Sequence, residues 1–169
     1  MSEYDCTADV MEHKRKVEYW ARDFVHWLEG RIRQHDNSKL MPPEKAVFDE
    51  YTPKLKELVF GSDEYKAALV GMGEGLKHHY EINRHHPEHY ENGINGMTLV
   101  DLVEMFCDWL AAAEKAQRPI DIDYVTKRFN LSPQLVDILV NTMRETDFWC
   151  EVNGVPVVYF TPESLRGKA

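Results

Sequence analysis

The chain has 169 residues, of which 43% are hydrophobic and 29% charged, so it is long enough to form one globular domain with a real core. Its formal net charge of −9 argues against a protein that binds long nucleic acid, which needs a basic face. A small phosphorylated ligand stays compatible with this charge, because a bound cation supplies local positive charge.

The N-terminus is polar and acidic, and no apolar run approaches the ~18 residues that span a bilayer. Cys6, Cys107 and Cys150 are isolated and indicate free thiols in a reducing compartment. We therefore expect a cytoplasmic protein that does not enter a membrane.

The apolar periodicity of the first two thirds of the chain predicts helices. The first, at about 8–33, is amphipathic, with Trp20 and Trp27 on a stripe that we expect to be buried. A second helix is predicted at about 45–60, interrupted near Pro53, and a third at 64–84. Glycines at positions 71, 73 and 75 weaken the third helix or permit close packing.

The last third begins with a strong helix predicted at 98–117, which starts with a capping-box pattern of Thr98 and Asp101. Shorter helices are predicted at 121–129 and 132–146. The Asn153-Gly154 pair between two β-prone runs predicts a hairpin. The fold class is therefore all-α, with a small C-terminal β-hairpin.

His35 and Asp36 form the first candidate metal site, because adjacent histidine and aspartate side chains are able to bind one cation. His13 lies with the apolar stripe of the first helix. A histidine there is usually part of the core, but the nearby His35-Asp36 pair favours a role as a third ligand. Imidazole and carboxylate together suit Mn, Fe, Co, Ni or Zn, and Mg is a further option.

Asp101, Glu104 and Asp108 share one face of the helix at 98–117, whose other faces are apolar. A solvated acidic face is the ordinary explanation of such spacing. The wide apolar arc instead favours buried acids, which require a cation or a hydrogen-bond network. We predict Asp108 as a metal ligand and Glu104 as a residue that orients a ligand histidine.

Five of the eight histidines lie within residues 77–90. A polar helix surface with incidental histidines is one explanation, and a phosphate-recognition surface that includes Asn83 is another. A third is a second metal site made by His79 with His85 or His86. The sequence leaves these open.

Several strings resemble the HD superfamily of metal-dependent phosphohydrolases. The order His13, His35-Asp36, Asp108 is similar to its H…HD…D ligand order. The strings HDNSKL, HHYEINRHHPEHYENGINGM and DLVEMFCDW resemble an uncharacterised family of short phage and bacterial HD-like proteins. The resemblance implies an HD-domain-like helical bundle that uses a divalent metal to cleave phosphoesters. We expect residues 1–118 to form this metal-binding core, with residues 119–169 packed on the same domain.

The sequence thus predicts a metal-dependent phosphohydrolase, a phosphomonoesterase or a phosphodiesterase, acting on a small phosphorylated substrate, with a nucleotide favoured. Besides the metal ligands and Glu104, we expect Lys39, His79, Asn83 and His86 to contact phosphate oxygens or to protonate the leaving group. The extra histidines are a feature shared with two-metal HD phosphodiesterases and with HD-type diiron oxygenases, so an oxygenase is an alternative. A non-catalytic protein that binds a nucleotide or another protein is a second alternative, and a homodimer is compatible with the acidic surface.

Overall fold

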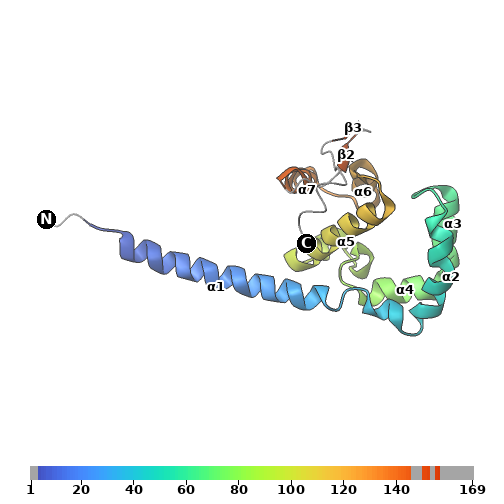
Figure 1. The fold of residues 1–169 in the computed structure, drawn as a ribbon, viewed down its shortest axis with the longest axis horizontal. Helices are drawn as coiled ribbons and strands as arrows, with labels where there is room; N and C mark the ends of the chain where they lie inside the picture. Colours follow the sequence, from blue (N-terminus) through green and yellow to red (C-terminus); the bar gives the residue numbers. More distant parts are fainter. Residues whose placement is uncertain (1–3, 146–149, 153–154, 157–169) are drawn as a thin grey trace. The chain divides into compact units, whose positions relative to one another are not determined.

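The computed structural model describes residues 4–145, 150–152 and 155–156 of the chain. These residues form seven α-helices, several 3-10 turns and three short strands (Figure 1). The predicted all-α character is confirmed, whereas the HD-like arrangement of the bundle stays a prediction. None of the helices in the described ranges combines the length and apolar character needed to cross a bilayer.

The chain divides into two compact units, an N-terminal unit of Met1–His79 and a C-terminal unit of Tyr80–Ala169. The division falls inside the helix α4 (Gly73–Ile82). The domain boundary predicted after residue 118 lies within the C-terminal unit, and that prediction stays untested.

The first helix of the N-terminal unit, α1 (Thr7–Ile32), is uninterrupted, as predicted (Figure 1, blue). None of its residues is buried, and Trp20 is 62% exposed. The expected buried stripe is therefore not seen, because no other element of the N-terminal unit covers this face. His13 is exposed along with the stripe.

Helix α1 leads through the 3-10 turn η1 (Asn37–Leu40) to α2 (Glu44–Lys56). The interruption predicted near Pro53 does not occur, since α2 continues past this residue to Lys56. A proline removes one intrahelical hydrogen bond, and near the C-terminal end of a helix that loss leaves the remaining ladder in place.

The prediction of a single helix at 64–84 is wrong, because two helices occupy this range. Helix α3 (Asp63–Gly71) is capped by Ser62, and α4 begins at Gly73. The chain breaks there because Gly73 has φ of +50°, which a right-handed helix does not accommodate.

Close packing explains another glycine of this segment. A Cβ atom on Gly75 would lie 2.7 Å from the side chain of Val47, so the absence of a side chain lets α4 approach α2. This contact places the buried face of α4 against the start of α2.

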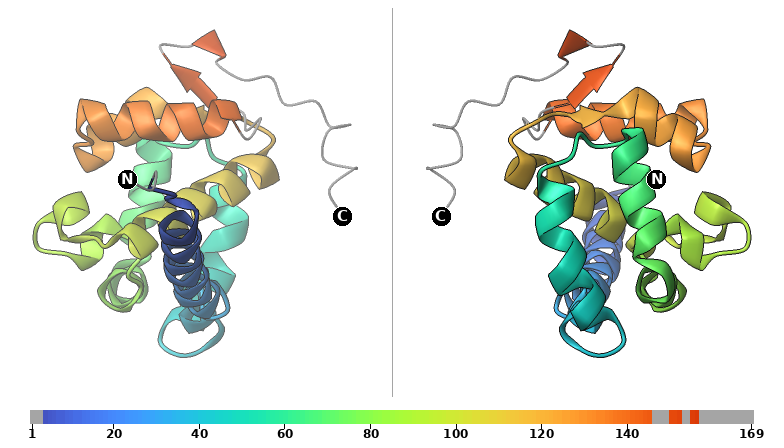
Figure 2. Two further views of the ribbon diagram at one scale, coloured as in Figure 1. Left: turned by 90° about the vertical axis from the view of Figure 1, so that its left-hand side faces the viewer. Right: turned by 90° about the vertical axis from the view of Figure 1, so that its right-hand side faces the viewer.

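The C-terminal unit is built around α5 (Leu99–Ala116), which follows the 3-10 turns η2 (Pro87–His89) and η3 (Gly93–Gly96). Helices α6 (Ile122–Phe129) and α7 (Pro133–Glu145) match the predicted ranges, and they pack with α5 around one core (Figure 2). The core residues are buried apolar side chains from all three helices and the segments that join them: Phe106, Ile120, Ile122, Val125, Leu131, Leu139, Val140 and Met143.

Three short strands complete this unit. Strand β1 (Ile120–Asp121) pairs in parallel with β2 (Cys150–Val152), which pairs antiparallel with β3 (Val155–Pro156). The turn residues of the predicted hairpin, 153–154, lie outside the described residues, so the hairpin as a whole stays a prediction. The parallel strand β1 was not predicted from the sequence.

Candidate metal centre

The His35-Asp36 pair lies in the turn that follows α1. Asp36 has φ of 58°, a left-handed conformation that aspartate tolerates better than most residues. This turn brings Nε2 of His35 to 3.6 Å from Oδ2 of Asp36, and both side chains are about three-quarters buried. Two donor atoms of the kinds that bind transition metals are therefore adjacent here.

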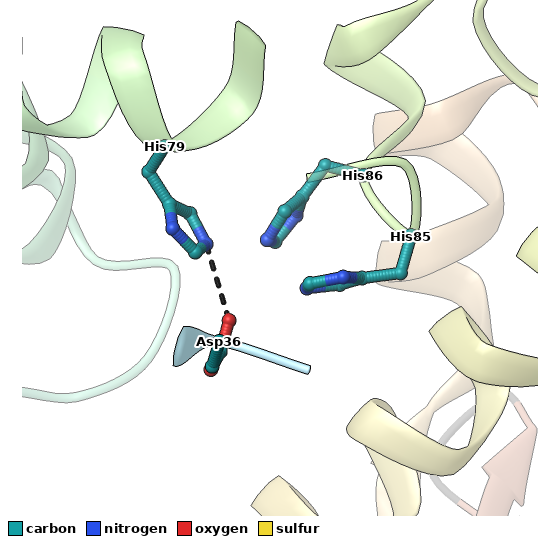
Figure 3. Close-up of side chains that lie close together, drawn as sticks. All are labelled: Asp36, His79, His85 and His86. Atoms are coloured by element: carbon teal, nitrogen blue, oxygen red, sulfur yellow. Dashed lines mark ion pairs between the residues drawn. The ribbon is translucent and has the colours of Figure 1, made fainter. Parts of the chain in front are cut away.

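His79 adds a third donor from α4. Its side chain is buried, and its Nε2 atom lies 3.5 Å from Oδ1 of Asp36 (Figure 3). Two ligands at ~2.1 Å from a tetrahedral metal are about 3.4 Å apart, so each of the two pairs, His35 with Oδ2 of Asp36 and His79 with Oδ1 of Asp36, has a spacing that two ligands of one ion would have. His35, Asp36 and His79 are called the N-terminal donor set below.

Glu44 lies behind this set, at the start of α2, and is completely buried. Its Oε2 atom is 2.8 Å from Nδ1 of His79 and accepts a hydrogen bond from Oγ of Ser38 at the same distance. Its Oε1 atom is 2.8 Å from Nδ1 of His78. Burial raises the pKa of Glu44, but the hydrogen bonds with His78, Ser38 and His79 outweigh it, so the net pKa is lowered.

The environment of His79 keeps its ring neutral. Burial lowers the pKa of His79, and the charge of Lys39 lowers it further, while Glu44 and Asp36 act in the opposite direction; the net pKa is lowered. A neutral imidazole is the form that binds a metal. Lys39, predicted to contact phosphate, lies with its Nζ atom 2.6 Å from Oδ2 of Asp36.

In the C-terminal unit, Asp101 is buried, and its carboxylate is occupied by structural partners. It accepts hydrogen bonds from the guanidinium of Arg84, the hydroxyl of Tyr90, and the backbone and hydroxyl of Thr98. The contacts with Thr98 complete the predicted capping box of α5. Asp101 therefore connects the start of α5 to the preceding loop.

Glu104, one turn further along α5, is buried beside a histidine. Its Oε1 atom lies 3.3 Å from Nδ1 of His85, which is also buried. The role predicted for Glu104, to orient a ligand histidine, requires this kind of placement. The acidic stripe is not a solvated face, since Asp101 and Glu104 are both buried.

His85 has two further donors near it within the C-terminal unit. The rings of His85 and His86 have centroids 4.1 Å apart, and Figure 3 shows the two side chains next to each other. His85 has a ligand atom within 4.8 Å of one of His86, and in a separate pairing a ligand atom within 4.8 Å of one of Asp108. His85, His86 and Asp108 are called the C-terminal donor set below.

Besides Lys39 and Glu104, two predicted residues lie outside both donor sets. His13 is exposed on α1, and Asn83 is half-buried just after α4. Their predicted roles, as a metal ligand and as a phosphate contact, stay predictions.

Sequence reasoning missed Glu44 and Ser38. Glu44 follows two prolines and has the ordinary character of a first-turn glutamate, so no sequence signal distinguishes it. Ser38 could have been predicted, because it lies in the same HDNSK string as His35 and Asp36.

The donor sets lie within a segment that is characteristic of one protein family. Neither a curated protein nor a solved structure matches the chain. Residues 2–145 match the model of DUF5662, a family of unknown function. Since this match extends over most of the sequence, the chain belongs to the DUF5662 family.

Proposed function

We propose that this protein is a metal-dependent phosphohydrolase acting on a small phosphorylated substrate, with a nucleotide as the favoured class. The observation that carries the proposal is the N-terminal donor set, in which the carboxylate of Asp36 has Nε2 of His35 3.6 Å from one oxygen and Nε2 of His79 3.5 Å from the other. The buried carboxylate of Glu44 lies 2.8 Å from Nδ1 of His79, and metal-binding histidines commonly donate their other ring nitrogen's hydrogen to such a carboxylate.

The donor types define the chemistry of the proposed centre. Two imidazoles and one carboxylate suit Mn, Fe, Co, Ni or Zn and leave coordination positions for water and substrate. A divalent ion there supplies Lewis acidity toward the phosphoryl group and activates water for its hydrolysis. The protein's part is to hold the three ligands, and Glu44 fixes the ring of His79.

The C-terminal donor set is proposed to bind metal as well. It contains Asp108, the ligand predicted from the sequence, and Glu104 lies beside His85 as Glu44 lies beside His79. The number of metal ions bound per chain would show whether one donor set or both bind metal.

Phosphate contacts are assigned to Lys39, Asn83 and His86 on the basis of their chemistry and their neighbours. Lys39 is next to the N-terminal donor set through its contact with Asp36. A lysine there neutralises charge on a phosphate oxygen as it develops during hydrolysis.

Elemental analysis of the chain, purified without a chelator or a histidine tag, tests the proposal. We expect at least one transition-metal ion per chain and hydrolysis in a screen of nucleotides and other phosphate esters. Asp36→Ala removes the central carboxylate and is expected to abolish both. Asp49→Ala, which removes an exposed aspartate of the same unit that pairs with Lys45, is expected to retain both. An Asp36→Ala variant with unchanged metal content and hydrolysis would refute the site.

A diiron oxygenase is the second candidate, and the presence of a donor set in each unit favours it. That function predicts about two irons per chain, a coloured protein and little phosphatase activity. No metal after reconstitution with Mn, Co or Ni would refute both enzymes and leave a non-catalytic protein that binds a nucleotide or another protein.

A further inference from the structure

Two consecutive histidines of α4 share one buried carboxylate. His78 and His79 point about 100° apart around the helix axis, yet each Nδ1 atom lies 2.8 Å from a different oxygen of Glu44. Glu44 is completely buried, so this carboxylate is placed where water does not compete for its oxygens. The Oγ atom of Ser38 donates a third hydrogen bond to Oε2.

The chemistry of a carboxylate then determines which ring nitrogen carries the proton. An ionised carboxylate only accepts hydrogen bonds, so an imidazole nitrogen at a short hydrogen-bond distance from it carries the proton. In His79 that nitrogen is Nδ1, 2.8 Å from Glu44, because Nε2 lies 3.5 Å from Asp36. In a neutral ring with its proton on Nδ1, Nε2 has a free lone pair. For His79, Nε2 is the atom that lies 3.5 Å from Oδ1 of Asp36.

The ring of His79 is also held from another side. Phe48 contacts it in an edge-on arrangement, with ring centroids 5.2 Å apart. Packing against Phe48 restricts the position of the ring, while the hydrogen bond to Glu44 restricts its rotation. The two contacts therefore point one nitrogen at Asp36 and the other at Glu44.

We propose that Glu44 is a positioning residue that fixes the Nδ1–H tautomer of both His78 and His79, so that His79 presents an unprotonated Nε2 to a metal ion. His78 and Ser38 hold the carboxylate in place by occupying its other acceptor positions. This inference rests on the proposed function for its use of a metal, whereas the tautomer itself is a property of the metal-free chain.

A replacement of Glu44 by glutamine separates the proton-directing role from simple space filling. Glutamine has nearly the same volume, but one of its two terminal groups donates instead of accepting. It is therefore able to keep the Nδ1–H tautomer of only one of the two histidines. Glu50→Gln is the matched control, because Glu50 lies on the same helix, is exposed and pairs only on the surface with Lys54.

The first measurement is nitrogen-15 NMR of histidine-labelled, chelator-treated protein, with His78→Gln and His79→Gln used to assign the signals. We expect the Nδ1–H tautomer for both rings in the wild type and in Glu50→Gln. We expect at least one ring to change in Glu44→Gln. An Nε2–H tautomer of His79 in the wild type would overturn the proposal, and this test needs no variant of Glu44 that folds.

The second measurement is titration with Co²⁺ alone, followed by its visible absorption. Glu44→Gln is expected to weaken Co²⁺ binding about 10- to 100-fold, and Glu50→Gln to leave it unchanged. Equal affinity of wild type and Glu44→Gln would overturn the positioning role while leaving the metal centre intact. A wild type that binds no Co²⁺ but shows the Nδ1–H tautomers would refute the proposed function and support the positioning of the rings by Glu44.

Discussion

Replacement of Asp101 by asparagine tests the hydrogen-bond network at the start of α5. The side chain is completely buried and accepts two hydrogen bonds from Arg84, one from Tyr90 and two from Thr98. Asparagine has the same shape but no charge, and its amide group presents hydrogen atoms to partners that are themselves donors. We expect a large loss of stability without a change of fold.

The magnitude follows from the surroundings of the two charges. Removing one partner of a buried ion pair costs about 3–5 kcal/mol. The side chain of Arg84 is 44% exposed, so water recovers part of its solvation, and the lower end, about 3 kcal/mol, is the expected loss. Thr98→Ala removes only the cap hydroxyl and is expected to cost about 1 kcal/mol.

Urea unfolding followed by circular dichroism measures both variants. At a typical slope of about 2 kcal/mol per molar urea, Asp101→Asn is expected to lower the midpoint by roughly 1.5 M, with the slope unchanged. A shift no larger than that of Thr98→Ala would show that the buried charge contributes nothing beyond its cap.

Three other results are expected. Gly75→Ala places a methyl group against α2 and is expected to lower the free energy of unfolding by about 1–3 kcal/mol. Gly30→Ala, in open space on α1, is expected to raise the free energy of unfolding by about 0.5–1 kcal/mol. Thermal or urea unfolding measures both variants. Folding lowers the pKa of Glu44, so the unfolded chain binds this proton more tightly than the folded chain does. The stability that Glu44 contributes is therefore present above the ordinary glutamate pKa and is lost as the pH falls through the lowered pKa of the folded state. Urea unfolding measured over a range of pH is expected to show a smaller loss in Glu44→Gln. Partial desolvation and the charges of Glu104 and Asp108 raise the pKa of the Cys107 thiol, although its residue is exposed. Iodoacetamide is therefore expected to label Cys107 of chelator-treated protein more slowly than an unperturbed thiol, and mass spectrometry to detect faster labelling in Glu104→Gln; equal rates in the two proteins would contradict the electrostatic cause.

The fold was predictable where a local signal decides the conformation. The capping box of Thr98 and Asp101 marks the start of α5, and Asp121 and Ser132 cap the two helices that follow. Prediction failed where a single backbone angle decides whether a helix continues or ends. The helix break at Gly73 depends on a positive φ, and the sequence offers three glycines within five residues without showing which one adopts it.

The candidate ligands His35 and Asp36 could be found from the sequence, whereas Glu44, which hydrogen-bonds to His79, could not. His35 and Asp36 are adjacent in the sequence, so their proximity needs only the turn that follows α1. Glu44 reaches His79 across 35 positions, and that contact depends on the packing of α4 against α2. Such a contact has no periodicity or motif, because it is made by tertiary structure alone.

The same chemical arrangement occurs independently in each unit. In both, a buried histidine has Nδ1 near a buried glutamate, Glu44 for His79 and Glu104 for His85. Among the described residues, five polar or charged side chains are buried, and four of them form these two pairs. Burying such groups is costly, and replacing a buried ion pair by apolar side chains of similar volume is often neutral or stabilising.

Stability alone therefore does not account for the two pairs. Each histidine also has an aspartate within reach of a shared ion, Asp36 for His79 and Asp108 for His85. Under the proposed function, the glutamate would orient a ligand histidine and the aspartate would coordinate the metal. The test replaces a whole histidine–glutamate pair by leucine and methionine. If the pair has only a structural role, the variant is expected to be as stable as the wild type or more stable, with unchanged metal content. If the pair belongs to a metal centre, the folded variant is expected to bind less metal.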